Sequence, residues 1–410
     1  MSKILNLNCN MYDIVIIGGG IAGLYSAYKI HKTHPHLTCM ILEKNSELGG
    51  RIHYEELNHE EMKEGGGFLR TTDTETIRLL DEIQIPYYFT RHPIQYTFKP
   101  VHVMKMMEEL RVHYMSHEPI HITFEEYARS IWGQQRYNQF IKTTMYIDYR
   151  DSLMENVLTD VSDFMYNVTG YTEGIVDWNH MIYILISRIT CPMIKNCTVM
   201  NIVPKNAWTI HTSVGTIQSR RIILATNVTS ARKLLPTFHL LRYIHPSSCT
   251  KIFVKVADSC IKWMKIHVPI HTIVDSILHN IMPIDPEKGI YLIGYSDEEQ
   301  ADELSSYVHD SLANRTRLAR LAETSLLLPV YSLSITRIVG KYWPCAMHKI
   351  NPAIPYTEYR ECKHAIQCPL SSMRIVGEMT AIGDGGWIAD AIQSTDVITQ
   401  DWLDDIVNVE

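Results

Sequence analysis

The chain lacks the features that mark several large classes of protein. Lys and Arg (38) are outnumbered by Asp and Glu (45), and the net charge of −7 gives no reason to expect a nucleic-acid partner. The nine cysteines form no C-x-x-C pair and no Cys/His cluster of metal-binding spacing, so we predict reduced thiols, no metal site and a cytoplasmic protein. Met1–Met11 lacks a signal-peptide pattern, and the longest apolar run, Met181–Ile186, is too short for a transmembrane helix.

What remains is an ordinary globular composition. The 410 residues are 46% apolar and 20% charged, without internal repeats or low-complexity segments, which leaves room for two or more domains. The acidic balance is mildly compatible with a cationic small substrate. Nothing in the sequence indicates an oligomeric state.

The most informative motif begins at residue 13. An apolar strand pattern (residues 13–17) leads directly into Gly18-Gly19-Gly20-Ile21-Ala22-Gly23 and then into a helical pattern. In such a G-x-G-x-x-G turn, Gly18 permits the tight turn, Gly20 lets the backbone approach a pyrophosphate, and Gly23 lets helix and strand pack closely. The first turn of the helix offers unpaired N–H groups to phosphates. The order strand, glycine turn, helix predicts a Rossmann-type dinucleotide site.

Three further segments extend this prediction. A second apolar strand, Met40–Leu42, ends in Glu43, which can accept hydrogen bonds from ribose hydroxyls, and Lys44 follows. Gly49-Gly50-Arg51 forms a bend with a guanidinium at its exit, and a guanidinium can bind a phosphate bidentately. In Gly65-Gly66-Gly67-Phe68 the glycines allow the backbone to lie against a flat group, whereas Phe68 argues for an anchored loop rather than a flexible one.

These motifs resemble, in order and over nearly the whole length, the flavin-containing amine oxidase family, which is related to protoporphyrinogen oxidases and phytoene desaturases. The C-terminal flavin motif of the family is matched by Gly377-Glu378-Met379-Thr380 and by Gly386-Trp387-Ile388, and its adenine-side strand by residues 199–202. The resemblance implies FAD as the cofactor. Because the Ser-Gly-Gly-Cys-Tyr motif for covalent attachment is absent, we expect the FAD to be non-covalent.

The resemblance also implies residues for the chemistry. Residues 249–256 resemble the strand that carries the family's lysine near flavin N5, with Lys251 in its place; alternation puts Lys255 on the same face, where we predict a surface residue. Trp387 matches one aromatic wall of the amine site, and Trp343 matches a tryptophan near the flavin. A second wall is expected around residues 353–356.

The sequence therefore predicts an α/β fold in which a Rossmann-type FAD-binding domain (residues 1–75, 190–235 and 370–410) is interleaved with an α+β substrate domain (76–189 and 236–369) that has a mixed sheet and a helical insert. We expect an FAD-dependent oxidase that transfers hydride from a small-molecule amine to flavin N5, giving an imine or aldehyde, with dioxygen reduced to hydrogen peroxide. The alternatives are an oxidoreductase or desaturase for an apolar, porphyrinogen-like substrate and a non-catalytic FAD-binding interaction protein. The predicted catalytic residues are Lys251 and Trp387, and the predicted cofactor-binding residues are Gly18, Gly20, Ile21, Ala22, Gly23, Glu43, Lys44, Gly50, Arg51, Gly66, Gly67, Phe68, Val199, Trp343, Gly377, Glu378, Gly386, Trp387 and Ile388.

Overall fold

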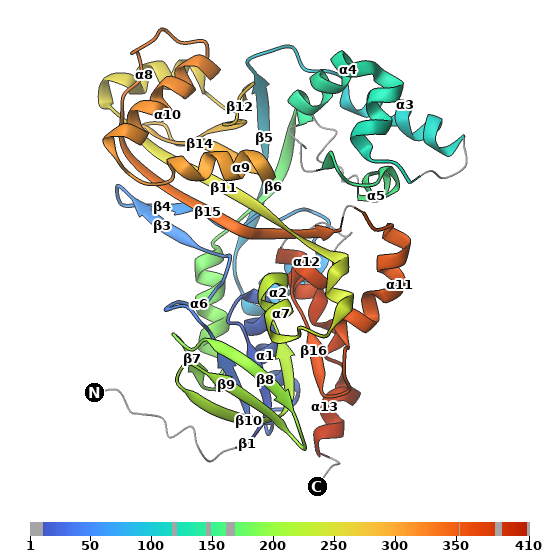
Figure 1. The fold of residues 1–410 in the computed structure, drawn as a ribbon. Helices are drawn as coiled ribbons and strands as arrows, with labels where there is room; N and C mark the ends of the chain where they lie inside the picture. The colour runs from blue at the N-terminus through green and yellow to red at the C-terminus, as the bar shows by residue number, and fades with distance from the viewer. Residues whose placement is uncertain are drawn as a thin grey trace.

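The computed structural model describes residues 11–116, 121–144, 149–160, 169–351, 353–381 and 388–407. Two seven-stranded sheets organise these residues (Figure 1). One sheet lies in the lower half of Figure 1 and contains the glycine turn, while the other forms the upper half. The predicted combination of a Rossmann-type part and a second part with a mixed sheet is confirmed.

The first sheet has the order β7-β2-β1-β10-β9-β8, with β16 also paired to β10. Strands β1, β2 and β16 run parallel to β10 and are almost entirely apolar, as expected for a sheet covered on both faces. The strands are β1 (Met11–Ile17), β2 (Cys39–Leu42), β7 (Met193–Ile194), β8 (Val199–Pro204), β9 (Trp208–Thr212), β10 (Gly215–Leu224) and β16 (Met373–Ile375).

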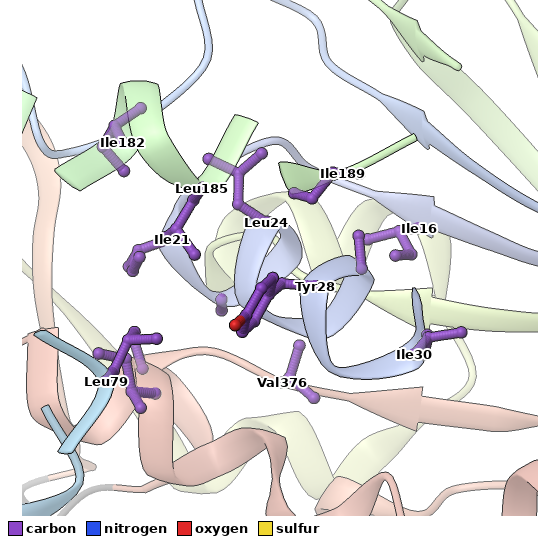
Figure 2. Close-up of a cluster of buried hydrophobic side chains, with 14 of the residues drawn as sticks. Ile16, Ile21, Leu24, Tyr28, Ile30, Leu79, Ile182, Leu185, Ile189 and Val376 are labelled. Carbon is purple, nitrogen blue, oxygen red and sulfur yellow. The ribbon is translucent and has the colours of Figure 1, made fainter. Parts of the chain in front are cut away.

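Helices cover both faces of this sheet. On one face, Ile14 and Ile16 of β1 pack against Leu24 and Tyr28 of α1 (Ile21–Thr33), a cluster drawn in Figure 2. On the other face, the alternate residues Val15 and Ile17 share a cluster with side chains of α7 (Val228–Leu234) and α11 (Tyr356–Gln367). The alternation of β1 therefore fixes which helices lie on which side.

Two helices from the predicted substrate segments belong to the same core. Leu79 of α2 (Thr74–Ile83) and Leu185 of α6 (Trp178–Arg188) belong to the same buried cluster as Leu24, and Figure 2 shows Leu185 next to Leu24. These helices pack on the nucleotide side because an amphipathic helix is placed by the surface that it covers. The domain boundaries at residues 75 and 190 stay a prediction.

The second sheet has the order β15-β11-β14-β13-β12-β5-β6. Ile252 and Val254 of β11 face a cluster that includes α8 (Asp258–His267), α9 (Glu298–Leu304) and α10 (Leu312–Ser325). Phe253 faces the other way, toward the hairpin of β3 (Tyr54–Leu57) and β4 (Glu60–Lys63). The strands are β5 (Tyr87–Tyr96), β6 (Gly170–Val176), β11 (Ile244–Val256), β12 (His271–Ile273), β13 (Asn280–Asp285), β14 (Ile290–Asp297) and β15 (Ile335–Ile350).

The helical insert consists of α3 (Val103–Met115), α4 (Phe124–Thr144) and α5 (Met154–Asp160), which share one buried cluster at the upper right of Figure 1. The backbone of α4 leaves helical geometry at Gly133, where φ is 73°, so α4 consists of two helical segments. A capping box begins the first segment, since Glu126 N–H donates to Thr123 Oγ1 at 3.2 Å.

Two segments combine different elements within a short stretch. Strand β5 lies between the helices α2 and α3, because its run of Tyr, Phe and Thr favours a strand. The C-terminal segment is divided into α12 (Ile388–Gln393), a 3-10 turn and α13 (Gln400–Val407). There Ser394 and Thr395 donate their hydroxyls to carbonyls three residues earlier, which competes with regular helix bonding.

The eight cysteines in the described ranges are all unpaired thiols. Within the same ranges no helix combines the length and the apolar character needed to cross a bilayer.

Candidate functional site

The glycine turn connects β1 to α1 in the geometry that its sequence predicts. Gly18 has φ +111°, and a Cβ at this position would lie 2.2 Å from Ala225 O; a Cβ at Gly23 would lie 2.0 Å from Gly18 O. Both positions therefore exclude any larger residue. Gly20 precedes the first turn of α1, which includes Ile21 and Ala22, in extended geometry. The free N–H groups of this turn form the anion-binding end of the helix.

The segment after β2 is bound to this turn through the backbone. Gly49 N–H donates to Gly19 O at 2.8 Å, and a Cβ at Gly50, where φ is +63°, would lie 3.0 Å from Gly20 Cα. Glu43 is buried and its two oxygens accept the N–H groups of Gly19 and Asn45, each at 2.8 Å. Each oxygen keeps a second lone pair for a ribose hydroxyl. Lys44 beside it is exposed.

The loop Gly65–Gly67 is held on both sides but open in its middle. A Cβ at Gly65 would lie 1.7 Å from Arg51 O, and one at Gly67 would lie 2.9 Å from the ring of Trp178, whereas a Cβ at Gly66 would meet nothing within 4 Å. Trp178 Nε1 also donates to Gly67 O at 2.9 Å. The loop thus presents backbone at Gly66 to open space, as a flat ligand requires. Phe68 next to it packs against Tyr171 of β6.

Lys251 lies on β11 and reaches the same loop. Its Nζ donates to Gly65 O at 2.7 Å and lies 4.9 Å from the centre of the Tyr295 ring. Burial lowers the pKa of the Lys251 ammonium, because its contacts are a neutral carbonyl and an aromatic ring. A lysine with a lowered pKa can act in proton transfer or in binding of water. The predicted catalytic lysine and the predicted glycine loop are therefore brought together.

Arg51 and Glu378, which are far apart in the sequence, meet in a largely buried polar network. Arg51 Nη1 donates to Glu378 Oε2 at 3.0 Å and to Ala346 O at 2.6 Å. His348 of β15 donates to the same carboxylate twice, from its backbone N–H to Oε1 at 2.7 Å and from Nδ1 to Oε2 at 2.5 Å. Burial alone would raise the pKa of Glu378, but the hydrogen bonds from His348 and the charge of Arg51 outweigh it and keep this pKa below its ordinary value.

The other nitrogen of His348 is also occupied. Its Nε2 accepts the N–H of Val228 at 3.1 Å and lies 3.2 Å from Cys345 Sγ. The hydrogen bond from Val228 requires an unprotonated Nε2, so the ring is neutral and carries its proton on Nδ1. Neither His348 nor Cys345 was among the residues that we predicted. Their sequence positions on the strand that carries Trp343 give no local signal of this role, because only the fold brings that strand to Glu378.

The remaining predicted residues either lie near the glycine turn, the glycine loop and Glu378 or fall outside the described ranges. Trp343 Nε1 donates to Glu64 O at 3.0 Å, which places the ring beside the glycine loop. Gly377, with φ +121°, joins β16 to Glu378, and Ile388 begins α12. Val199 begins β8, and Cys197 just before it donates its N–H to Glu43 O at 2.8 Å. Gly386 and Trp387 lie outside the described residues, so their expected contacts stay predictions; residues 353–356 lead into α11.

A group of possible metal ligands lies beside the glycine loop, and a hollow lies away from it. His53, Glu55 and Glu64 offer ligand atoms within 4.8 Å of one another, but Glu55 is exposed and Lys341 lies close to Glu64. A hollow of about 310 Å³ is lined by residues at the amino ends of β1 and β2, including Tyr12 and Cys39. Since the glycine turn lies at the opposite ends of these strands, the hollow is not part of the site.

Comparison with known proteins agrees with this geometry. Residues 16–83 match the family of NAD(P)-binding Rossmann-like domains. Over 64 residues the chain is 38% identical to uncharacterized protein R188 of Acanthamoeba polyphaga mimivirus, a match that covers 16% of this chain and 13% of that protein.

Solved structures match over the whole length. Cyclohexylamine oxidase from Brevibacterium oxydans superposes with a TM-score of 0.74 at 14% identity, covering 98% of this chain and 99% of the other. Putrescine oxidase bound to putrescine gives 0.72 at 11% identity and 97% and 99% coverage. A protein assigned as a protoporphyrinogen oxidase from Exiguobacterium gives 0.69 at 13% identity and 98% and 100% coverage. The chain has the fold of these oxidases. The fold that the motif resemblance implies is confirmed, and at these identities the likeness extends to the fold alone.

Proposed function

We propose that this chain is an FAD-dependent oxidase of a small amine, whether a polyamine, a monoamine or an amino acid. The amine is oxidised to an imine that hydrolyses to an aldehyde, while dioxygen is reduced to hydrogen peroxide. The observation that carries the proposal is the half-buried Lys251, bonded to the glycine loop that the family resemblance assigns to the flavin. The fold shared with two amine oxidases supports it.

The residues present fit FAD from its adenosine end to its flavin ring. The N–H groups after Gly20 and the Arg51 guanidinium suit the pyrophosphate, and Glu43 suits the adenosine ribose. Glu378 has a carboxylate that suits a ribityl hydroxyl, and the open face at Gly66 suits the isoalloxazine ring. No covalent attachment is expected. We assign cofactor binding to these groups and not to the exposed Lys44 side chain.

When bound, FAD supplies the hydride acceptor, and dioxygen restores its oxidised form. The role of Lys251 is to hold a water molecule or a proton at the loop, for which its lowered pKa suits it. Lys63 and Lys251 both lie at this loop, and two cations there disfavour a protonated amine. The substrate is therefore bound uncharged, no side-chain base is needed, and kcat/KM should rise with pH as the free amine deprotonates.

The test is an anaerobic screen of polyamines, monoamines and amino acids that follows bleaching of the flavin absorbance. We expect at least one amine to bleach the flavin and air to restore its colour with release of peroxide. Lys251→Met should slow reduction by about tenfold or more. The matched control is Lys255→Met on the same strand, because Lys255 Nζ is bonded to Asp258 at 3.0 Å and not to the loop.

A second candidate is an oxidoreductase for an apolar substrate, which the likeness to the protein assigned as a protoporphyrinogen oxidase supports. In that case amines fail to bleach the flavin, a porphyrinogen bleaches it, and Lys251→Met leaves the rate unchanged. A protein that is colourless, or yellow but never reduced by any donor, would instead be a non-catalytic binding protein.

A cytoplasmic location is part of the proposed function and is favoured by the unpaired cysteines.

A further inference from the structure

A second lysine, Lys63, is bonded to the same glycine loop as Lys251. Lys63 ends β4, and its Nζ donates to Gly67 O at 3.0 Å, while Lys251 donates to Gly65 O at 2.7 Å. In the sequence the two carbonyls flank Gly66, the one glycine of the three whose Cβ position faces open space. Two ammonium groups thus bind the backbone just before and just after the glycine that would meet the flavin ring.

The charge of this pair is only partly compensated. The nearest recorded carboxylate is that of Glu173 on β6, whose Oε1 lies 3.8 Å from Lys63 Nζ, beyond hydrogen-bond distance, while its Oε2 lies 3.4 Å from His92 Nε2. Burial lowers the pKa of Lys63, although Glu173 partly offsets this effect. Lys63 and Lys251 are close enough for the charge of one to lower the pKa of the other. Asp297 and Glu173 both act on Lys251 in the opposite direction, and Glu173 is shared with Lys63 and His92.

A structural role alone does not explain Lys63. Gly67 O already accepts Trp178 Nε1 at 2.9 Å, and Trp178 is fully buried, so this carbonyl is satisfied without the lysine. A methionine or leucine at position 63 would cover Trp178 as well as the lysine stem does, since the stem contributes only methylene groups. The charge is the property of Lys63 that the packing of the loop does not require.

We propose that Lys63 is a second functional lysine, a positioning residue that acts with Lys251 to place positive charge beside the flavin and thereby favours its anionic, reduced or adduct forms. This inference rests on the proposed FAD site. It concerns the charge at the loop and not the identity of the substrate. A cation near the flavin tunes its electronics without touching the reacting carbon.

The experiment is a sulfite titration of the holoprotein at neutral pH, because sulfite adds to flavin N5 and the adduct is anionic. We expect Lys63→Met to retain FAD and to weaken sulfite binding by about tenfold or more, and Lys63→Arg to recover most of the affinity. Glu173→Gln removes the counter-charge and should strengthen sulfite binding. Lys255→Met is the control, with affinity expected to equal that of the natural protein.

Equal sulfite affinity in Lys63→Met and the natural protein would overturn the inference. If Lys63→Met fails to fold or to hold FAD, Glu173→Gln decides, and unchanged or weaker sulfite binding by that variant is then the negative result. The two proposals fail separately. A natural protein that never binds FAD removes the proposed function, whereas one that binds FAD and oxidises amines, with Lys63→Met indistinguishable from it, removes only the role of Lys63.

Discussion

Replacement of Glu378 by Gln tests the polar network that Glu378 forms with Arg51 and His348. The carboxylate accepts three hydrogen bonds: from Arg51 Nη1 to Oε2, from His348 N–H to Oε1 and from His348 Nδ1 to Oε2. A glutamine has one oxygen and one NH₂ group. If the oxygen takes the Oε2 place, the NH₂ group faces the backbone N–H of His348; if it takes the Oε1 place, the NH₂ group faces both other donors.

The histidine cannot relieve this conflict by moving its proton. A proton on Nε2 would face the N–H of Val228, which lies 3.1 Å away. At least one buried donor therefore loses its partner, and the ion pair with Arg51 is lost as well. Because the Arg51 side chain is 34% exposed, most of the cost comes from the buried groups. We expect the free energy of unfolding to fall by about 3 kcal/mol, within a range of roughly 2–5 kcal/mol.

Urea unfolding of the FAD-free protein measures this loss, with Glu361→Gln on the exposed face of α11 as the matched control, expected within about 0.5 kcal/mol of the natural protein. The pH dependence gives a second check. Since the folded-state pKa of Glu378 lies below the ordinary value of 4.5, its contribution is complete above pH 4.5 and is lost as pH falls through the lower folded-state value. The difference between the two proteins should be constant at neutral pH and shrink in acid. A variant as stable as Glu361→Gln at neutral pH would refute the reasoning.

Two further predictions concern the glycines and the core. Gly23→Ala should destabilise the protein and prevent FAD binding, since its Cβ would lie 2.0 Å from Gly18 O. Gly66→Ala should leave the stability of the FAD-free protein unchanged and weaken FAD binding by about tenfold or more. Calorimetric titration with FAD separates the two, and full affinity in Gly66→Ala would show that the loop does not face the flavin. Leu24→Ala should cost about 2–5 kcal/mol in urea unfolding, because Leu24 is 0% exposed, and Leu312→Ala, at a 79% exposed position, should cost almost nothing.

Elements whose neighbours are close in sequence were predictable. The turn after β1 combines a buried parallel strand, three spaced glycines and an amphipathic helix, and each of these signals is local. The cap at Thr123 is likewise local, because both partners lie within one turn. The hairpin β3–β4 and the strand β6 were missed because neither has the run of β-branched or apolar residues that identifies a buried strand, and both depend on partners elsewhere in the chain.

The candidate site divides in the same way. Motif spacing located Gly18, Glu43 and Glu378 as separate pieces, yet it did not predict that Arg51 would bond to Glu378, 327 positions further along. His348 was missed because a histidine on a strand has no distinctive local signal. Its role depends on the pairing of β15 with β11, because this pairing places the end of β15, which carries His348, beside the nucleotide-binding part.

The two lysines of β11 show what alternation determines and what it does not. Period-two alternation puts Lys251 and Lys255 on one face, and on sequence alone both suit a solvent-exposed edge. In the fold Lys255, expected at the surface, is only 18% exposed and is paired with the Asp258 carboxylate, whereas Lys251 is bonded to a carbonyl of the glycine loop. The charge of the partner separates them, because a carboxylate neutralises an ammonium and a carbonyl does not. Burial therefore lowers the pKa of Lys251 beside its carbonyl, and its charge stays available for a ligand.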